Sequence, residues 1–344
     1  MIHRRVTRLF NLRFFGIMAL LLLLQNGFFD SNVVPMVKKR VKYTMLTIPN
    51  ATVTTDDYEL FTPSYTVDIY EDSGARRLNE RKEFKEKMCQ KMNIGGYVKT
   101  KEFMYYSKIY KLLVCAPPKT GCSSIKRHML QLAGLSGKLK VHSQRARKAI
   151  AASQVLGKSV KKVLKSSVSS TLVEVVRHPL ERLVSGYREK FKNGAPISGM
   201  WGNFMKKYRR SRGIDTSNRT LSFHEFLEMI AYKMETKGRN SIDRHFRPTT
   251  LLCSPCGIKY DYIFHTDTLT QDLQYLAGKL NITGINISAR MNSKANKTRG
   301  VTYESYYKDI PVSLMGRIYT LFKEDFVINN FKVLPSMQSV TDAY

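Results

Sequence analysis

The residues best suited to chemistry lie in one stretch, Lys111 to Leu130, which reads KLLVCAPPKTGCSSIKRHML. An apolar run with strand character ends at two prolines, a short loop follows, and apolar residues then recur at helical spacing. Such a loop points backbone N–H groups at one spot beside the positive end of a helix dipole, and so forms an anion site. Lys119 adds a positive charge, and Ser123 and Ser124 add hydroxyl donors. The loop lacks GxxxxGK[ST] and is no Walker A sequence, and by itself an ordinary surface turn explains it as well as a phosphate site does.

A second stretch of the same kind, Thr171 to Phe191, reads TLVEVVRHPLERLVSGYREKF. Its β-branched start predicts a strand over 171–176, and Pro179 suits the first turn of a following helix. Arg177 stands where the strand ends and Ser185 follows eight residues later, so both side chains can reach one phosphate group. The alternative is an arginine that caps the sheet and a serine that faces the core.

The ordered pair of stretches resembles the membrane-bound carbohydrate sulfotransferases of the chondroitin, dermatan and HNK-1 type. Their pattern is roughly PKxxCTNWK followed by RxPFxRLxSAYxxKF, matched here by PKTGCSSIK and RHPLERLVSGYREKF. The residues at 123–125 replace the usual Thr-Asn-Trp, which leaves the packing behind the loop open, and Gly186 replaces Ala. Residues 245–248 and 252–263 are similar to the family elements HWxP and LCxPCxxxYDxI. The resemblance covers about Lys101 to Phe331.

The resemblance implies an α/β fold with a P-loop-like central, mostly parallel sheet flanked by helices. It also implies transfer of a sulfuryl group from 3′-phosphoadenosine-5′-phosphosulfate (PAPS) to a sugar hydroxyl. Lys119 then neutralises charge on the leaving phosphate, which is catalysis by positioning and electrostatics with no metal requirement. The first stretch is the 5′-phosphosulfate loop and the second the 3′-phosphate site. The expected donor-binding residues are Pro118, Lys119, Thr120, Gly121, Cys122, Ser123, Ser124, Lys126, Arg177 and Ser185.

The acceptor hydroxyl must lose a proton, and histidine is the favoured base because its pKa lies near working pH. His142, between the two stretches and after an expected strand, is the first candidate, since related uronyl 2-O-sulfotransferases use a histidine in that interval. His245, in the loop HFRP, is the second. A structural, hydrogen-bonded histidine is the alternative for both. We expect His178 to be a neighbour of the site and His128 to lie on the surface.

The charge of the chain implies a polyanionic partner. Its 57 Lys and Arg stand against 27 Asp and Glu, a formal net charge of +30. Two basic clusters lie at 138–165, which contains no acidic residue, and at Trp201 to Arg212, where aromatic residues interleave and the basic residues run from Lys206 to Arg212. Charge alone does not choose among nucleic acid, acidic lipid and an acidic polysaccharide. No zinc-finger spacing or RNP-like aromatic motif is present, which disfavours nucleic acid. With the resemblance, this predicts 4-O-sulfation of N-acetylgalactosamine in chondroitin or dermatan.

Other functions stay open on the sequence. The acceptor could be a glucuronyl terminus of the HNK-1 type or a terminal N-acetylgalactosamine on an N-glycan. A non-catalytic lumenal polyanion-binding protein would keep the basic clusters without needing Lys119, Arg177 and Ser185 together. A P-loop kinase would need Walker elements, which are missing.

The N-terminus predicts a type II Golgi membrane protein. Basic residues precede an uncharged run that ends in LLLLL, with no A-x-A-like cleavage site, so we expect a signal-anchor, although a signal peptide is the alternative. The expected order is a cytoplasmic tail (1–13), an anchor (14–29), a lumenal stem (30–100) and a catalytic domain (101–344). Five N-glycosylation sequons agree with a lumenal chain; they begin at Asn50, Asn218, Asn281, Asn286 and Asn296.

The five cysteines leave at least one thiol free or intermolecular. We expect Cys115 and Cys122 to be buried packing residues. Cys253 and Cys256 form a CxxC, and without a second ligand pair a structural disulfide that involves one of them is favoured over zinc.

Helical or strand patterns cover five further segments. We expect helices at 76–92, packed on the catalytic domain, and at 223–232, 268–280 and 314–326, with a strand at 260–264. Ser222 and Glu225 fit a capping box at the start of the second helix.

Overall fold

The structure is a computed structural model that describes residues 73–95, 98, 102–157, 159, 162–164, 168–283, 285–287 and 302–338. Residues 68–344 form one compact unit, and a separate unit, residues 1–67, lies wholly outside the described part. The expected tail, anchor and most of the expected stem are therefore also outside it. In the ranges that are described, no helix is long and apolar enough to span a bilayer.

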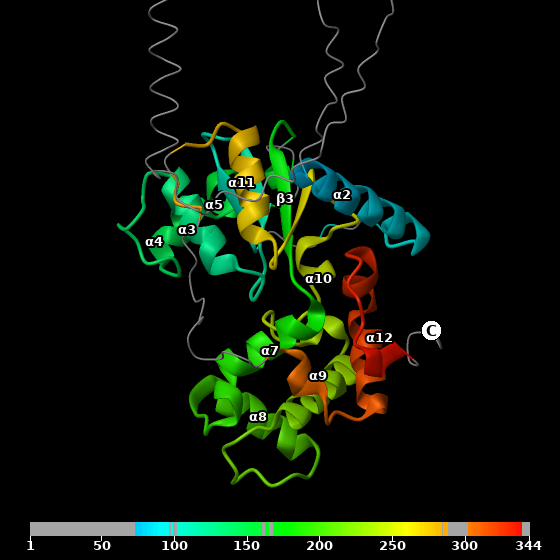
Figure 1. The fold of residues 1–344 in the computed structure, drawn as a ribbon. Helices are drawn as coiled ribbons and strands as arrows, with labels where there is room; N and C mark the ends of the chain where they lie inside the picture. The colour runs from blue at the N-terminus through cyan, green and yellow to red at the C-terminus, as the bar shows by residue number, and fades with distance from the viewer. Residues whose placement is uncertain are drawn as a thin grey trace, which may run out of the picture. The chain divides into compact units, whose positions relative to one another are not determined.

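A four-stranded sheet with the order β1-β2-β3-β4 forms the centre of the fold (Figure 1). Its strands are β1 (Met104–Ser107), β2 (Leu112–Cys115), β3 (Thr171–Val176) and β4 (Tyr262–His265). β2, β3 and β4 are parallel, and only β1 is antiparallel, to β2. The mostly parallel sheet and the strand 171–176 are confirmed, and β4 begins two residues later than predicted. β1 was not predicted, because a four-residue strand shows too little alternation to be recognised.

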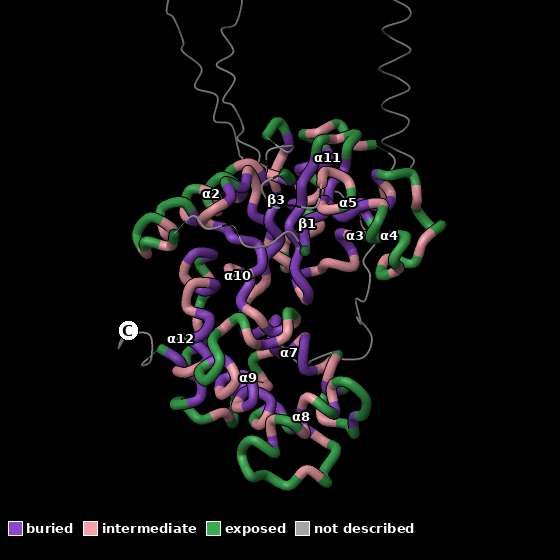
Figure 2. Tube along the Cα trace, turned by 180° about the vertical axis from the view of Figure 1, so that it is seen from behind, coloured by how far each residue is buried: buried purple, intermediate pink, exposed green. Residues whose placement is uncertain are grey.

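Both faces of the sheet are covered. On one face lie α3 (Cys122–Leu132), α4 (Gln144–Ile150) and α11 (Leu269–Lys279), and on the other lie the short helices α5 (Ala152–Val155) and α10 (Thr250–Cys253). This explains why β2, and β3 apart from Thr171 and Glu174, are apolar without alternation, as in parallel sheets buried on both sides. Figure 2 shows the strands as the mostly buried centre of this region.

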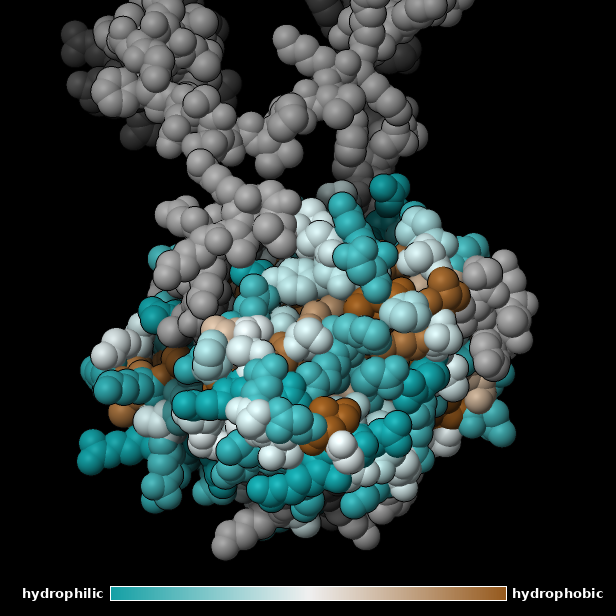
Figure 3. Space-filling model, turned by 90° about the horizontal axis from the view of Figure 1, so that it is seen from below, coloured by the Kyte–Doolittle hydropathy of each residue, from teal (hydrophilic) through white to brown (hydrophobic). Residues whose placement is uncertain are grey.

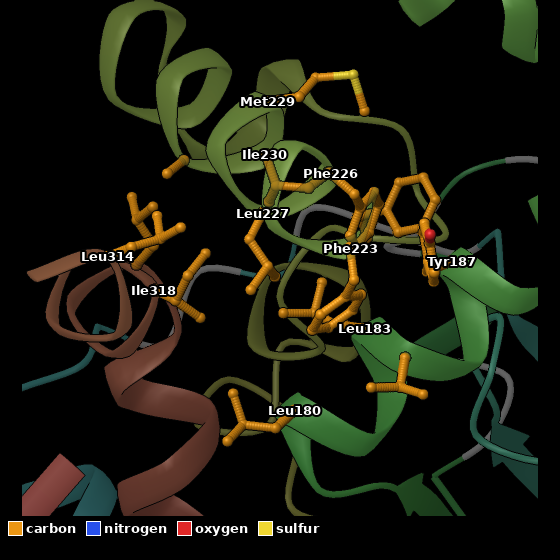
Figure 4. Packing of buried hydrophobic residues seen from close by; sticks show 14 of the residues in the cluster. Leu180, Leu183, Tyr187, Phe223, Phe226, Leu227, Met229, Ile230, Leu314 and Ile318 are labelled. Atoms are coloured by element: carbon orange, nitrogen blue, oxygen red, sulfur yellow. The ribbon is translucent and has the colours of Figure 1, made fainter. Parts of the chain in front are cut away.

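A second core forms among the helices beyond the end of β3. α7 (Pro179–Lys190), α8 (Gly199–Ser211), α9 (Phe223–Lys237) and α12 (Val312–Ile328) contribute to it. Leucines of α7 face the aromatic and aliphatic residues of α9, and Leu314 and Ile318 of α12 complete the cluster (Figure 4). The hydroxyl of Ser222 accepts a hydrogen bond from the Glu225 N–H at 3.1 Å, which confirms the N-cap half of the predicted capping box. The carboxylate of Glu225 binds Arg209 of α8 instead of completing the box.

Helix α2 (Ser73–Lys91) packs on this folded unit, as predicted for 76–92. It contacts the edge strand β4 as well as α11 and α12. Arg77 and Arg81 bind the fully buried carboxylate of Asp272, and Lys85 pairs with Glu174 in the middle of β3. α2 therefore supplies the counter-charges for two acids that the sheet region buries.

Two disulfides converge on the CxxC segment. Cys253 is bonded to Cys115 of β2, and Cys256 to Cys89 near the end of α2. The expected disulfide at Cys253 or Cys256 is confirmed. The expectation that Cys115 is only a packing residue is wrong, because the chain fold brings two residues 138 positions apart within bonding distance. Cys122 is the free cysteine of the described part, and no group of metal-ligating side chains forms there.

Candidate active site

The loop after β2 has the backbone of an anion site. Thr120 closes its first turn, because its hydroxyl donates to the Pro117 carbonyl at 2.9 Å. Lys119 and Gly121 both have left-handed backbones, with φ of 73° and 85°. A lysine in this region is strained, and such strain concentrates at functional sites. α3 then starts with no capping side chain and no acidic residue in its first turn, so its positive end is not neutralised locally.

Arg177 lies beside this loop, at the end of the neighbouring strand. Its Nη1 donates to the backbone carbonyl of Lys119 at 3.1 Å, and its Nη2 donates to Glu181. Its Nε is buried without a hydrogen-bond partner among the described residues. The two parts of the predicted donor site therefore lie next to each other, as expected when both follow parallel strands of one sheet. Ser185 is half-buried on α7.

The ammonium group of Lys119 is paired with the carboxylate of Glu189 from α7. Glu189 also accepts a hydrogen bond from Lys190 at 2.7 Å. Burial lowers the pKa of Lys119, and the bond to Glu189 opposes this shift. Burial acts to raise the pKa of Glu189, but its bonds to Lys119 and Lys190 outweigh it and bring the pKa to about 2. Lys119 is thus a sheltered positive charge held by an anionic partner.

Arg182 is a site residue that sequence reasoning missed. It is fully buried on α7, and its guanidinium donates to the backbone carbonyls of Pro118, Arg244 and Arg247 at 3.0, 3.0 and 2.6 Å. Burial lowers its pKa to about 10. Through these bonds it fastens the anion loop to the segment that carries His245. The only sequence signal is an arginine amid the apolar face of the predicted helix.

His142 lies against the loop as well. Its Nε2 is 3.0 Å from the Ser123 hydroxyl, and its Nδ1 is 3.3 Å from the Lys126 ammonium. The residues before it form a turn and not the strand that we expected, since a polar, glycine-containing segment leads directly into α4. His142 is an exposed residue, and partial desolvation of its ring, followed by the charge of Lys126, lowers its pKa.

His245 forms a pair with Asp243, its Nδ1 lying 2.6 Å from the carboxylate Oδ1. The same oxygen accepts the His245 backbone N–H at 2.9 Å. The ring of Trp201 from α8 lies edge-on, with centroids 5.9 Å apart. Sequence reasoning missed Asp243, although the D-x-H spacing was visible, because the spacing alone does not say that both side chains turn to the same side.

The other described histidines are outside this arrangement. His128 is buried and bonded to Gln131, so the expected surface position is wrong; the apolar side of α3 carries it into the sheet face. His178 packs among Tyr303, Phe326 and Phe331 and bonds to the Lys332 carbonyl, as a structural neighbour of Arg177. His224 is exposed on α9.

Most of the remaining predicted residues also surround the loop. Pro118 is buried, with its carbonyl bound to Arg182, and Ser124 is buried in the first turn of α3. Lys126 extends over the ring of Tyr105 at 5.5 Å, and the free thiol of Cys122 is half-buried. The loop thus combines a strained turn, an uncapped helix start and several cations, which is chemistry suited to a multiply charged anion.

Comparison with known proteins points the same way. Residues 102–332 match the sulfotransferase family. The chain is 27% identical over 270 residues to carbohydrate sulfotransferase 9 of Homo sapiens, which covers 73% of this chain and 59% of that protein. It is 25% identical to human carbohydrate sulfotransferase 8 (74% and 63%) and to carbohydrate sulfotransferase 11 of Rattus norvegicus (65% and 65%). The matches thus span about three fifths of the relatives' lengths.

No solved structure matches the chain significantly. The family match covers both strand–loop–helix units, the segment of His245 and the disulfide-bonded CxxC. The chain therefore belongs to the sulfotransferase family.

Proposed function

We propose that this protein is a carbohydrate sulfotransferase that moves a sulfuryl group from PAPS to a sugar hydroxyl. The observation that carries the proposal is the position of Arg177, 3.1 Å from the carbonyl of Lys119 in a strained loop that opens an uncapped helix. The names of the relatives support the carbohydrate acceptor. The PAPS donor is the one implied by the family resemblance of both loops.

The residues present fit a donor that carries several negative charges. The start of α3 offers helix-dipole charge that no capping side chain and no acidic residue of its first turn offsets, and the buried Nε of Arg177 is a donor with no partner in the described structure. We assign the 5′-phosphosulfate to the loop at 118–124 with Lys126, and the 3′-phosphate to Arg177 and Ser185. Lys119 neutralises the charge that develops on the leaving phosphate, for which its ammonium must exchange Glu189 for the donor.

We propose an acidic glycan as acceptor, with N-acetylgalactosamine 4-O-sulfation of chondroitin or dermatan as the first candidate. A patch on α8 and α9, consisting of Lys207, Lys233 and Lys237, supports this. Within the described residues none of the three has an ion-pair partner, while the acids of α9 are bound by Arg209 and Arg317. The end of the molecule that carries these helices is largely hydrophilic (Figure 3).

The lysine patch lies near the candidate base. Burial and the charges of Lys207 and Lys237 lower the pKa of Lys233, and Asp243 acts on it in the opposite direction. A polymer bound through its acidic groups at the patch could therefore present a sugar to the pair of Asp243 and His245. The alternative acceptors to test beside it are a glucuronyl terminus and a terminal N-acetylgalactosamine of an N-glycan.

We propose a Golgi location with a single type II anchor. The support is the sequence pattern of residues 4–29 together with the two disulfides, which form in oxidising compartments. Asn218, Asn281 and Asn286, three of the five sequon asparagines, are exposed; the other two lie outside the described residues. Glycosidase digestion of the expressed protein and protease protection of microsomes would test this location.

Two measurements on the purified protein, nucleotide binding and sulfate transfer, test the proposed function. Calorimetry with 3′-phosphoadenosine-5′-phosphate should show binding that weakens by about 1.5–3 kcal/mol in Arg177→Ala. Radiolabelled PAPS should transfer label to chondroitin, and Lys119→Ala should remove most of this transfer while Lys308→Ala, an exposed control, keeps it. A chain that binds chondroitin but not the nucleotide would instead be a polyanion-binding protein.

A further inference from the structure

The two candidate histidines, His142 and His245, differ in which nitrogen can accept a proton, and this difference assigns the catalytic base. The inference rests on the proposed function and extends it. For His142 the neighbours decide the tautomer. An ammonium group only donates hydrogen bonds, so Nδ1 of His142 accepts from Lys126, and Nε2 must carry the proton that points to the Ser123 hydroxyl. Both nitrogens are then occupied, and neither offers a free lone pair that could take the proton of the sugar hydroxyl.

His245 has the opposite arrangement. Burial acts to raise the pKa of Asp243, but the hydrogen bonds from His245 outweigh it, so the pKa lies below its ordinary value and the group is a carboxylate. A carboxylate only accepts, which places the ring proton of His245 on Nδ1. Nε2 then carries the free lone pair, and no hydrogen-bond partner in the described residues occupies it.

A chain of contacts links His245 to Lys119. Arg182 binds the carbonyls on either side of His245 and the carbonyl that precedes Lys119. On the other side, the Lys190 ammonium lies 5.7 Å from the ring of Trp201, which packs on His245, and Lys190 shares Glu189 with Lys119. The other charged groups near the pair are Arg244, next in the chain, and Lys233 of α9.

We propose that His245 is the base that accepts the proton of the sugar hydroxyl through Nε2, and that Asp243 is the positioning residue that fixes its tautomer. In the step, a bond forms between the hydroxyl oxygen and sulfur while the bond from sulfur to the phosphate oxygen breaks. His245 takes the hydroxyl proton, and the electron pair of the broken bond remains on the phosphate, beside Lys119. His142 orients Ser123 toward the donor and does not exchange a proton with the acceptor.

The test compares His245→Gln, Asp243→Asn and His142→Gln, with the exposed His224→Gln as control, in the full chain. His245→Gln should lower kcat on the order of 10²–10⁴-fold and remove the acid limb of the kcat–pH profile. Asp243→Asn should lower kcat at least tenfold, because an amide can donate to Nδ1 and so move the proton to Nε2. In both variants the KM for PAPS should stay within about twofold of wild type, whereas His142→Gln should raise that KM and keep the acid limb.

Two further measurements separate catalysis from folding. Imidazole in the buffer should partly restore turnover of His245→Ala, and Asp243→Glu should recover more activity than Asp243→Asn. The inference is overturned if folded His245→Gln keeps the wild-type kcat and pH profile, or if His142→Gln is the variant that loses the acid limb. These outcomes are distinct from failure of the proposed function, in which the wild-type chain itself neither binds the nucleotide nor transfers sulfate.

Discussion

At the level of single residues, the positive charges of the site divide into two groups. Arg177 and Arg182 donate to backbone carbonyls and so hold the shape of the loop and of the segment at 243–247. Lys119 and Lys190 instead share the carboxylate of Glu189, a pairing that an incoming anion can replace. Arginine suits the first task because its planar guanidinium has five donors in a fixed geometry.

Replacing Arg182 should destabilise the protein and also disturb the site. In Arg182→Met, three backbone carbonyls lose their donor, among them the buried carbonyl of Pro118, so we expect a free energy of unfolding lower by about 2–4 kcal/mol and a raised KM for PAPS. Urea denaturation measures the first effect and initial rates the second. Arg188→Met, on the same helix, is the control. Equal stability of the Arg182→Met variant and the control would show that the carbonyls find other donors.

The pH dependence of stability should contain a contribution from His265. Burial, followed by the charges of Arg81 and Lys85, lowers its pKa to about 2, and its Nε2 is buried without a partner in the described part. Because the folded-state pKa lies below the unfolded value of about 6.5, this contribution is fully present above pH 6.5 and is lost as the pH falls. At pH 5.5 the contribution of His265 to the free energy of unfolding should be lower by about 1.4 kcal/mol.

Urea denaturation at pH 7.5 and 5.5 tests this value in the wild type and in His265→Gln. Between the two pH values, the free energy of unfolding of the wild type should fall by about 1.4 kcal/mol more than that of the variant, since glutamine does not titrate. An equal loss in both proteins would mean that His265 can be protonated in the folded state.

At the level of elements, helix α2 supplies the positive charges that pair with two buried acids of the sheet domain. Glu174 and Lys85 are both buried, and burial raises the pKa of Glu174 while Lys85 opposes the shift. The disulfide from Cys89 to Cys256 fastens the far end of the helix. A segment outside the family match thus completes the fold that carries the site.

Removing one member of the buried pair should cost more than removing both. Lys85→Met leaves a buried carboxylate without its partner and should lower the free energy of unfolding by about 3–5 kcal/mol. The double variant Lys85→Met, Glu174→Met should recover most of this loss, because both desolvation costs disappear. Chemical denaturation compares the variants with Lys87→Met, an exposed control on the same helix. A double variant as unstable as the single one would contradict this account.

At the level of the whole molecule, the positive charges differ in whether they are paired. The arginines that were traced above are bound to carboxylates or carbonyls, whereas the patch of Lys207, Lys233 and Lys237 has no carboxylate partner in the described residues. The basic run at 138–165 is only partly described, because Lys158, Lys161 and Lys165 lie outside the described ranges. Within it, Lys138, Lys140, Arg145, Arg147, Lys148 and Lys162 are exposed.

Neutralising the lysine patch should weaken the binding of the acidic acceptor without weakening the binding of PAPS. The triple substitution of Lys207, Lys233 and Lys237 by Gln should raise the KM for chondroitin by about tenfold at low salt and leave the KM for PAPS nearly unchanged. Added salt should reduce the difference from wild type. The control is the triple substitution of Lys87, Lys279 and Lys308 by Gln, which removes the same charge from other exposed positions. Equal effects of both triple variants would indicate a general effect of net charge.

The sequence by itself determined the local units of this protein. Both strand–loop–helix units, the N-cap at Ser222 and the helix that became α2 were predicted, because each depends on residues a few positions apart. The mostly parallel sheet also followed, through the family resemblance of the loops.

Only the tertiary structure decided how these units make a site. The bonds from Arg182 to the two loops, the pairing of Lys119 with Glu189 and the disulfide from Cys115 to Cys253 join residues between 62 and 138 positions apart. Periodicity carries no information on such contacts. The roles of His142 and His245 were open for the same reason, since the proton on a histidine ring is placed by whichever donor or acceptor the fold brings to each nitrogen.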